Sequence, residues 1–167
     1  GKLQGDEYIV KTVVTTNLIE EIADRYGVEY FNTLTGFKYI GELMTELEGK
    51  KQFIAGGEES YGYLIGDHVR DKDAIVSSAI IAEMTAFYKD KGSSLYEALI
   101  DMYLEYGYYR ERLVALYKKG KKGSEEIQQI MKRFREDPPS HLGNSEIVTV
   151  KDYQAGEEKN LRSGKVS

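Results

Sequence analysis

The stretch with the greatest chemical potential is a glycine-flanked acidic segment, Gly56-Gly57-Glu58-Glu59-Ser60-Tyr61-Gly62. It directly follows a short strand-forming run, and open α/β sheets bind their ligands outside the carboxyl ends of strands. A carboxylate at such a position can accept two hydroxyl hydrogens at once, which suits a sugar ring. The flanking glycines allow the backbone to approach a ligand closely. Because the same pattern is also typical of an acidic, solvated turn, the spacing alone leaves both interpretations open.

Basic residues that could contact a phosphate lie near this segment. Lys72 and Arg70 belong to Asp67-His68-Val69-Arg70-Asp71-Lys72-Asp73, and Lys38 begins a predicted helix just after Gly36. A lysine near phosphate can neutralise developing charge or transfer a proton. The acidic neighbours of Lys72 favour its charged form, so they favour charge stabilisation. The unpaired amides at a helix start could help Lys38 to bind phosphate. Ordinary surface ion pairs are the alternative for all three basic residues.

Composition excludes several other kinds of chemistry. Cys is absent and His68 and His141 are the only histidines, so the sequence predicts no metal site. Neither a Walker-type phosphate loop nor a Gly-x-Gly-x-x-Gly dinucleotide motif is present. The net charge of −5 shows no global bias toward nucleic acid, and the basic run 118–122 is interpreted as a solvated linker. Because no run of eighteen apolar residues occurs, we expect no membrane span and a cytoplasmic protein.

The elements that must position these residues alternate along the first part of the chain. Strand-like runs at 9–15, 28–34 and 52–55 are separated by helical patterns at 18–26 and 37–47, and two more helices follow. Capping signals accompany three of the four helices, which is typical of real helix starts. Short connections between alternating strands and helices predict a three-layer α/β/α domain with a mainly parallel sheet. The two later helices are expected at 74–91 and 95–106, and the N-cap residues are Asn17 (with Glu20), Asp73 and Ser94 (with Glu97).

A second part begins where the charge changes sign. Residues 1–109 hold 10 Lys and Arg against 19 Asp and Glu, whereas residues 110–167 hold 13 against 9. We therefore place a domain boundary at 112/113. Beyond it we expect a basic linker at 113–123, one helix from Ser124 to the prolines at 138–139, and one strand at 146–150. Because one helix and one strand cannot enclose a core, this part is expected to be an incomplete α+β fragment.

The acidic segment closely resembles the sugar-recognition loop of the phosphoglucomutase/phosphomannomutase family, the α-D-phosphohexomutases. The match covers Gly57-Glu58-Glu59-Ser60-Tyr61-Gly62, and the stretches 35–41, 67–73 and 104–108 resemble other parts of the same family domain, in the same order. By this resemblance, residues 1–112 are identified as the sugar-binding domain III. Residues 113–167 are similar to a linker and the truncated start of domain IV.

The resemblance implies an isomerase that interconverts hexose 1-phosphate and hexose 6-phosphate through a bisphosphorylated sugar. Carried over position by position, Glu58 and Ser60 would bind the sugar 3- and 4-hydroxyls beside Gly57. Lys72 would be the catalytic residue that reaches the transferring phosphate. Gly36, Lys38 and Arg70 would also contact the substrate.

Three other loops of that family do not occur in the sequence. They are the serine loop, the Asp-Gly-Asp metal loop and the Arg-x-Ser-Gly-Thr phosphate loop. We therefore expect these residues to be inactive alone and to bind no cofactor themselves, while the full-length enzyme uses Mg²⁺ and an activator of the glucose 1,6-bisphosphate type. The expected partners are a sugar phosphate and domains I, II and IV, with no nucleic acid or membrane.

Alternatives to this function remain open at the level of sequence. The phosphohexomutase interpretation competes with a phosphopentomutase-type enzyme, which would use related sugar recognition. It also competes with a non-catalytic carbohydrate- or nucleotide-binding module. A structural interaction domain that uses the tyrosine-rich stretch 103–117 is the third alternative.

Overall fold

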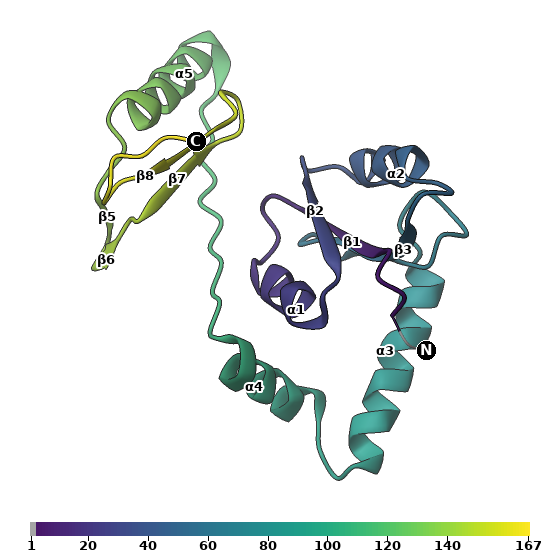
Figure 1. Ribbon diagram of the computed structural model, residues 1–167. Helices are drawn as coiled ribbons and strands as arrows, with labels where there is room; N and C mark the ends of the chain where they lie inside the picture. The colour runs from purple at the N-terminus through teal and green to yellow at the C-terminus, as the bar shows by residue number, and fades with distance from the viewer. Residues whose placement is uncertain (1–2) are drawn as a thin grey trace. The chain divides into compact units, whose positions relative to one another are not determined.

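The computed structural model describes residues 3–167, and the chain divides into two compact units, Gly1–Arg112 and Leu113–Ser167 (Figure 1). The first unit contains a four-stranded sheet in the order β2-β1-β3-β4. β1 pairs in parallel with β2 and β3, and only β4 is antiparallel, so the sheet is mainly parallel as predicted. The strands are β1 (Glu7–Thr12), β2 (Glu29–Thr33), β3 (Gln52–Glu58) and β4 (Gly62–Ile65).

Helices cover both faces of this sheet and complete the three-layer α/β/α architecture predicted from the sequence. The connection from β1 to β2 and the connection from β2 to β3 run in opposite directions across the sheet, so right-handed crossovers place their helices on opposite faces. One face carries α2 and the other carries α1 and α3, while α4 contacts α1 and α3 (Figure 1). The helices are α1 (Leu18–Tyr26), α2 (Phe37–Glu46), α3 (Ala74–Asp90) and α4 (Leu95–Tyr106).

The buried core lies between α2 and the sheet. Tyr8 at its centre makes edge-to-face ring contacts, with centroids 5.6 Å from Phe31 and 5.5 Å from Phe53. A Cβ atom at Gly56 would lie 3.1 Å from the Val10 carbonyl oxygen and from the Phe53 ring, so this strand glycine allows the layers to approach closely. This packing fixes the end of β3. The buried members of the core are Tyr8, Val10, Phe37, Ile40, Met44, Phe53 and Leu64.

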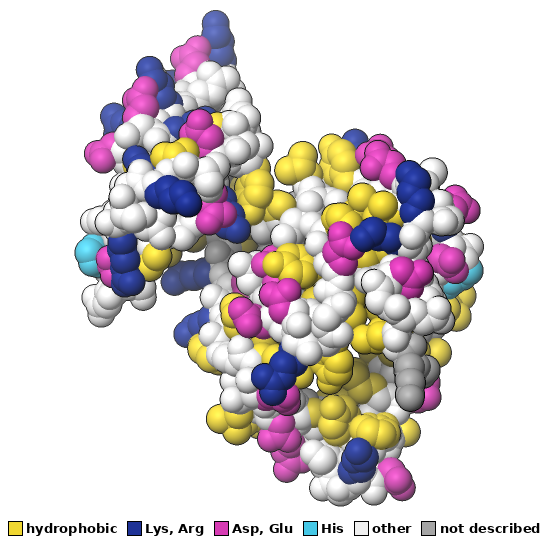
Figure 2. Space-filling model, viewed as in Figure 1, with side chains coloured by type: hydrophobic (Ala, Val, Ile, Leu, Met, Phe, Trp, Pro, Cys, Tyr) yellow, Lys and Arg dark blue, Asp and Glu magenta, His cyan; other side chains and the backbone are white. Residues whose placement is uncertain are grey.

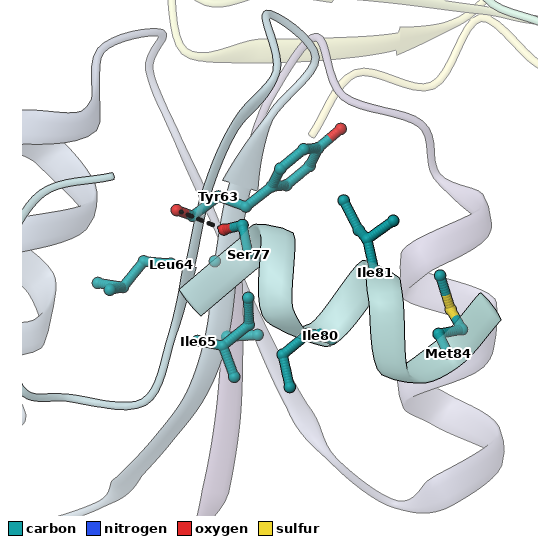
Figure 3. A pocket seen from close by; sticks show the side chains of 9 residues that line it. Tyr63, Leu64, Ile65, Ser77, Ile80, Ile81 and Met84 are labelled. Atoms are coloured by element: carbon teal, nitrogen blue, oxygen red, sulfur yellow. Dashed lines mark hydrogen bonds between the residues drawn. The ribbon is translucent and has the colours of Figure 1, made fainter. Parts of the chain in front are cut away.

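The face of the sheet opposite α2, which carries α1 and α3, is less completely covered. α3 is apolar around most of its circumference, and Ile75 and Phe87 are 83% and 52% exposed. Hydrophobic side chains are accordingly visible over much of the first unit in Figure 2. A pocket of about 360 Å³ lies between α3 and the strands β3 and β4 (Figure 3). It is lined almost entirely by apolar side chains, apart from Ser77, whose hydroxyl donates to the Tyr63 carbonyl at 3.4 Å.

Two strand predictions are corrected by the structure. β1 occupies Glu7–Thr12 rather than 9–15, because a turn closes directly after it: the Thr15 amide donates to the Thr12 carbonyl at 3.0 Å. The segment 56–62, expected as a loop, is a β-hairpin: β3 continues through Glu58 and β4 begins at Gly62. Strand propensity is weak for glycine, so the sequence pattern concealed this hairpin.

The predicted caps have mixed outcomes. Ser94 and Glu97 form the expected capping box at the start of α4. The capping role predicted for Asn17 and Glu20 is wrong, since Asn17 makes no side-chain cap bond. Its side-chain oxygen instead accepts from the buried ammonium group of Lys11 at 3.1 Å, which needs acceptors more than the helix end does.

Asp73 caps α3 as predicted. Its Oδ1 accepts from the amides of Ile75 and Val76 at 2.9 and 3.0 Å, and its Oδ2 lies 2.8 Å from His68 Nε2. The hydrogen bond from His68, followed by the helix amides, lowers the pKa of Asp73. A single carboxylate thus fixes both the start of α3 and the loop that carries Lys72.

This cap predicts a pH dependence of stability. Because the folded-state pKa of Asp73 lies below the unfolded value, its contribution is present above the unfolded pKa and is lost as the pH falls through the folded pKa. Urea unfolding of wild type and Asp73→Asn between pH 7 and pH 3 should therefore show a weaker acid dependence in the variant. Asp24→Asn is the matched control, because Asp24 is an exposed aspartate on α1. Equal pH slopes in wild type and Asp73→Asn would contradict the assignment.

The second unit contains one helix and two small antiparallel hairpins. Its helix starts at Gly120, not at the predicted Ser124. Gly123, near the start of this helix, packs closely against Lys118, because a Cβ at Gly123 would lie 2.7 Å from the Lys118 carbonyl carbon. The predicted strand at 146–150 is wrong, since residues 147–148 separate two strands. Within residues 3–167, no helix is long and apolar enough to cross a membrane. The elements are α5 (Gly120–Glu136), β5 (His141–Leu142), β6 (Ser145–Glu146), β7 (Thr149–Asp152) and β8 (Glu157–Asn160).

Candidate functional site

Glu58, the last residue of β3, is the centre of the candidate site. Its side chain is 3% exposed, and it lies at the carboxyl ends of the parallel strands. Its Oε1 accepts from the Gly36 amide at 2.8 Å, and its Oε2 lies 3.0 Å from Lys72 Nζ. One carboxylate therefore joins three segments that are far apart in sequence: the start of α2, the β3–β4 hairpin and the loop before α3.

Two glycines make these contacts possible. Gly36 has a φ of 127°, a conformation that favours glycine, and it turns its amide toward Glu58. A Cβ at Gly62 would lie 2.7 Å from Lys72 Cδ and 3.3 Å from Glu58 Oε2. The aliphatic part of Lys72 therefore crosses the hairpin through space that any other residue at 62 would fill.

The chemistry of this group of residues suits a hydroxylated, anionic ligand. A carboxylate has about four acceptor positions, so Glu58 can still accept hydroxyl hydrogens beside its two present donors. The side chain of Lys72 is 46% exposed, and its ammonium group supplies a positive charge beside the carboxylate. Ser60 lies in the exposed turn of the hairpin, and its hydroxyl has no hydrogen-bond partner within residues 3–167. A carboxylate, an ammonium group and an available hydroxyl thus occur together at the carboxyl ends of the parallel strands.

The structure groups only some of the predicted site residues. Gly36, Glu58 and Lys72 contact one another, and Gly57 and Ser60 lie beside Glu58 in the hairpin. Lys38 and Arg70 instead line a separate pocket of about 480 Å³ that does not include Glu58. There the ammonium group of Lys38 lies 4.7 Å from the centre of the Tyr39 ring, and Arg70 Nη2 lies 3.5 Å from Glu48 Oε2. These two residues have the ordinary surface contacts that the sequence left open as the alternative.

A buried polar network at the end of β1 was not predicted from the sequence. Lys11 is 2% exposed; its Nζ donates to the Thr15 carbonyl and to Asn17 Oδ1, both at 3.1 Å, and lies 2.9 Å from Glu20 Oε1. The one signal in the sequence was a lysine inside a run of apolar, β-branched residues. This network holds the turn that follows β1, next to the β3–β4 hairpin.

The hydroxyls of that turn bind Glu59. Glu59 Oε2 accepts from Thr12 Oγ1 at 3.0 Å. Thr15 Oγ1 lies 3.2 Å from Glu59 Oε2 and 2.8 Å from Thr12 Oγ1, and its single hydrogen is donated to one of these two oxygens at a time. Glu58, the last residue of β3, and Glu59, in the turn that follows it, therefore contact different neighbours. The sequence assigned no role to Glu59.

The described residues do not fit a magnesium site. Within residues 3–167, no three His, Cys, Asp or Glu side chains gather as metal ligands. Glu58 faces an ammonium group and an amide, which are donors rather than further oxygen ligands. The pocket of Figure 3 also has the wrong chemistry for a sugar phosphate, because its lining is apolar.

Comparisons with known proteins give one consistent family. Residues 1–103 match the family described as phosphoglucomutase/phosphomannomutase, alpha/beta/alpha domain III. The chain is 32% identical to the phosphoglucomutase of Staphylococcus haemolyticus over 146 residues, which is 87% of this chain and 27% of that protein. It is also 32% identical to the phosphoglucomutase of Staphylococcus saprophyticus over 160 residues, 95% of this chain and 29% of that protein. The chain thus spans less than a third of the length of these curated relatives.

Solved structures agree with the fold. A structure from Thermus thermophilus described as a phosphomannomutase has a TM-score of 0.54 and 26% identity, and the match covers 70% of this chain and 26% of that one. The open form of the Paramecium phosphoglucomutase parafusin has a TM-score of 0.58 over 95% of this chain and 29% of that one. Because it is only 20% identical, that second likeness supports the fold alone.

Proposed function

Because the chain belongs to the phosphoglucomutase/phosphomannomutase family through its α/β/α domain III, we propose that residues 1–112 form the sugar-recognition domain of a phosphohexomutase. The reaction would interconvert hexose 1-phosphate and hexose 6-phosphate through a bisphosphorylated sugar. The observation that carries the proposal is the buried carboxylate of Glu58, held between the Gly36 amide and Lys72 at the carboxyl edge of the sheet. A buried carboxylate with spare acceptor positions at this edge suits a polyol ligand.

In this proposal, Glu58 and Ser60 bind the 3- and 4-hydroxyls of the hexose. These hydroxyls keep similar positions when the sugar turns end for end between the two phosphoryl transfers. A site that contacts only them can therefore accept both orientations. Gly57 directly precedes Glu58, and the Tyr63 ring packs against it so closely that a Cβ at this position would lie 2.9 Å from Tyr63 Cδ1.

Lys72 stabilises the charge of the phosphate that is being transferred. Its side chain is partly exposed and its ammonium group is held by Glu58, so a bound sugar would bring its phosphate near an already positioned cation. Gly36 supports this arrangement by holding the other oxygen of Glu58. Lys38 and Arg70 would contact a phosphate of the substrate. To do so, Lys38 would have to leave the Tyr39 ring and Arg70 would have to leave Glu48.

The remaining chemistry would come from other domains. A serine loop, a magnesium loop and a second phosphate loop are the parts that the family resemblance assigns elsewhere, together with an activator of the glucose 1,6-bisphosphate type. We propose that residues 113–167 form a linker and the start of domain IV. The 167 residues should therefore bind a sugar phosphate without converting it.

The test is an NMR titration of the ¹⁵N-labelled chain with α-D-glucose 1-phosphate. We expect shift changes at Gly36, at Lys72 and along 57–62, and no glucose 6-phosphate in the same samples. Inorganic phosphate controls for binding of the anion alone. The 4-epimer α-D-galactose 1-phosphate controls for recognition of the hydroxyls and should bind more weakly. Equal responses to all three ligands, or none along 57–62, would overturn the proposed function; conversion of the sugar would overturn the assignment of the chemistry to other domains.

A further inference from the structure

The geometry points to Glu59 as a positioning residue, which the hydroxyls of Thr12 and Thr15 hold so that the turn of the β3–β4 hairpin presents Ser60 in a fixed direction. The inference rests on the proposed function, because Ser60 is proposed there as a sugar contact. It goes beyond it by assigning a role to the end of β1, which carries none of the proposed ligand contacts.

The two glutamates of the hairpin point in different directions. β1 and β3 are neighbours in the sheet, with Lys11 paired to Gly57, so Thr12 lies level with the end of β3. Glu58 points toward α2 and Glu59 points toward the end of β1. The two side chains thus hold the hairpin from two sides, immediately before Ser60.

The residues at the end of β1 that hold Glu59 are themselves firmly fixed. Thr12 is fully buried, and its hydroxyl bonds both to Thr15 Oγ1 and to Glu59 Oε2. The turn that contains Thr15 is itself held by Lys11, whose ammonium group binds the Thr15 carbonyl. Glu59 is therefore tied to a rigid part of the sheet, although it is itself exposed.

The contact between Glu59 and the end of β1 favours binding by ordering the turn in advance. Ser60 and Tyr61 lie in the short turn that the Glu58–Gly62 pair closes, and little fixes their side chains: Tyr61 is 89% exposed, and the Ser60 hydroxyl has no partner within the described residues. If the turn were free, a ligand would have to order it on binding, which costs affinity. Fixing one such side chain in advance changes affinity by about two- to tenfold.

The experiment compares three substitutions in the 167-residue chain. Thr12→Val keeps the shape but removes the hydroxyl, Thr12→Ser restores it, and Glu59→Ala removes the acceptor at an exposed position where the fold should tolerate it. Glu83→Ala, an exposed glutamate on α3, is the matched control. Two quantities are measured: the heteronuclear NOE of the Ser60 amide without ligand, and the Kd for α-D-glucose 1-phosphate.

We expect lower NOE values and about two- to tenfold weaker binding for Thr12→Val and Glu59→Ala, and wild-type behaviour for Thr12→Ser and Glu83→Ala. Unchanged NOE values and affinity in Thr12→Val and Glu59→Ala would overturn the inference. Equal losses in Thr12→Ser and Thr12→Val would also overturn it, because the hydroxyl would then be irrelevant. If the wild-type chain binds no sugar phosphate, the proposed function fails, and the NOE values alone decide whether the anchor orders the turn.

Discussion

Replacing Glu58 by glutamine is expected to weaken the binding of α-D-glucose 1-phosphate by about tenfold to a hundredfold while the fold is kept. Glu58 now accepts a hydrogen bond from the Gly36 amide on one oxygen and forms an ion pair with Lys72 through the other. Glutamine has only one acceptor oxygen, so its NH₂ group must face one of these two donors in either orientation. The substitution therefore disturbs Lys72 or the start of α2, in addition to any hydroxyl contact.

The change is measured by NMR titration of the variant, with thermal unfolding as a check on the fold. Glu83→Gln is the matched control, because Glu83 is an exposed glutamate on α3 that takes no part in the proposed site. In a full-length enzyme, forward and reverse kcat/KM should fall together, since both orientations of the sugar use the same contact. Wild-type affinity combined with a large loss of stability would show that Glu58 is a structural residue.

A second large effect is expected at Glu20, on stability rather than on binding. Glu20→Ala should lower the free energy of unfolding by about 3 kcal/mol, since it takes the anionic partner from a buried ammonium group. Lys11 is 2% exposed, and Glu20 is the carboxylate that pairs with it, at 2.9 Å. The Thr15 carbonyl and Asn17 Oδ1 still accept hydrogen bonds, but neither supplies a negative charge. We take the lower end of the usual range because the Glu20 side chain is 20% exposed.

Urea unfolding followed by circular dichroism measures this loss. Lys11→Met is the informative companion, because it removes the buried charge and keeps a chain of similar length. Its stability should fall less than that of Glu20→Ala, as Glu20 retains a hydrogen bond from Asn32 at 3.0 Å and is partly solvated. If Glu20→Ala lowered the free energy of unfolding less than Lys11→Met, the ion pair with Glu20 would not be what stabilises the buried Lys11.

The sequence was sufficient for the architecture because local signals and the global fold agree in the first unit. α4 has the predicted bounds, since Ser94 and Glu97 form a complete capping box and Gly107 follows the last turn. α1 likewise ends at Gly27, which adopts a left-handed φ of 66°. Such ends are local, so a single stretch of sequence specifies them.

The candidate site was only partly predictable, because its contacts cross long stretches of sequence. Glu58 could be identified from its glycine-flanked setting, but its pairing with Lys72 depends on the missing side chain at Gly62, which no local rule reveals. The role of Thr12 was invisible for the same reason, since its partner Glu59 lies 47 residues away. The hairpin was missed because glycines conceal its strands.

Tyr61 has a consequence for how this protein can change over generations. It is a non-glycine residue with a positive φ, 63°, and its ring is 89% exposed at the tip of the hairpin. An L-residue in this conformation costs roughly 1–2 kcal/mol, a cost that glycine does not have. Its ring buries almost nothing in return, so the fold itself gives no reason to keep it. If selection acted on folding alone, Tyr61 would be expected to be replaced by glycine or asparagine, which tolerate a positive φ. An aromatic ring kept at this position would therefore reflect selection for something other than folding.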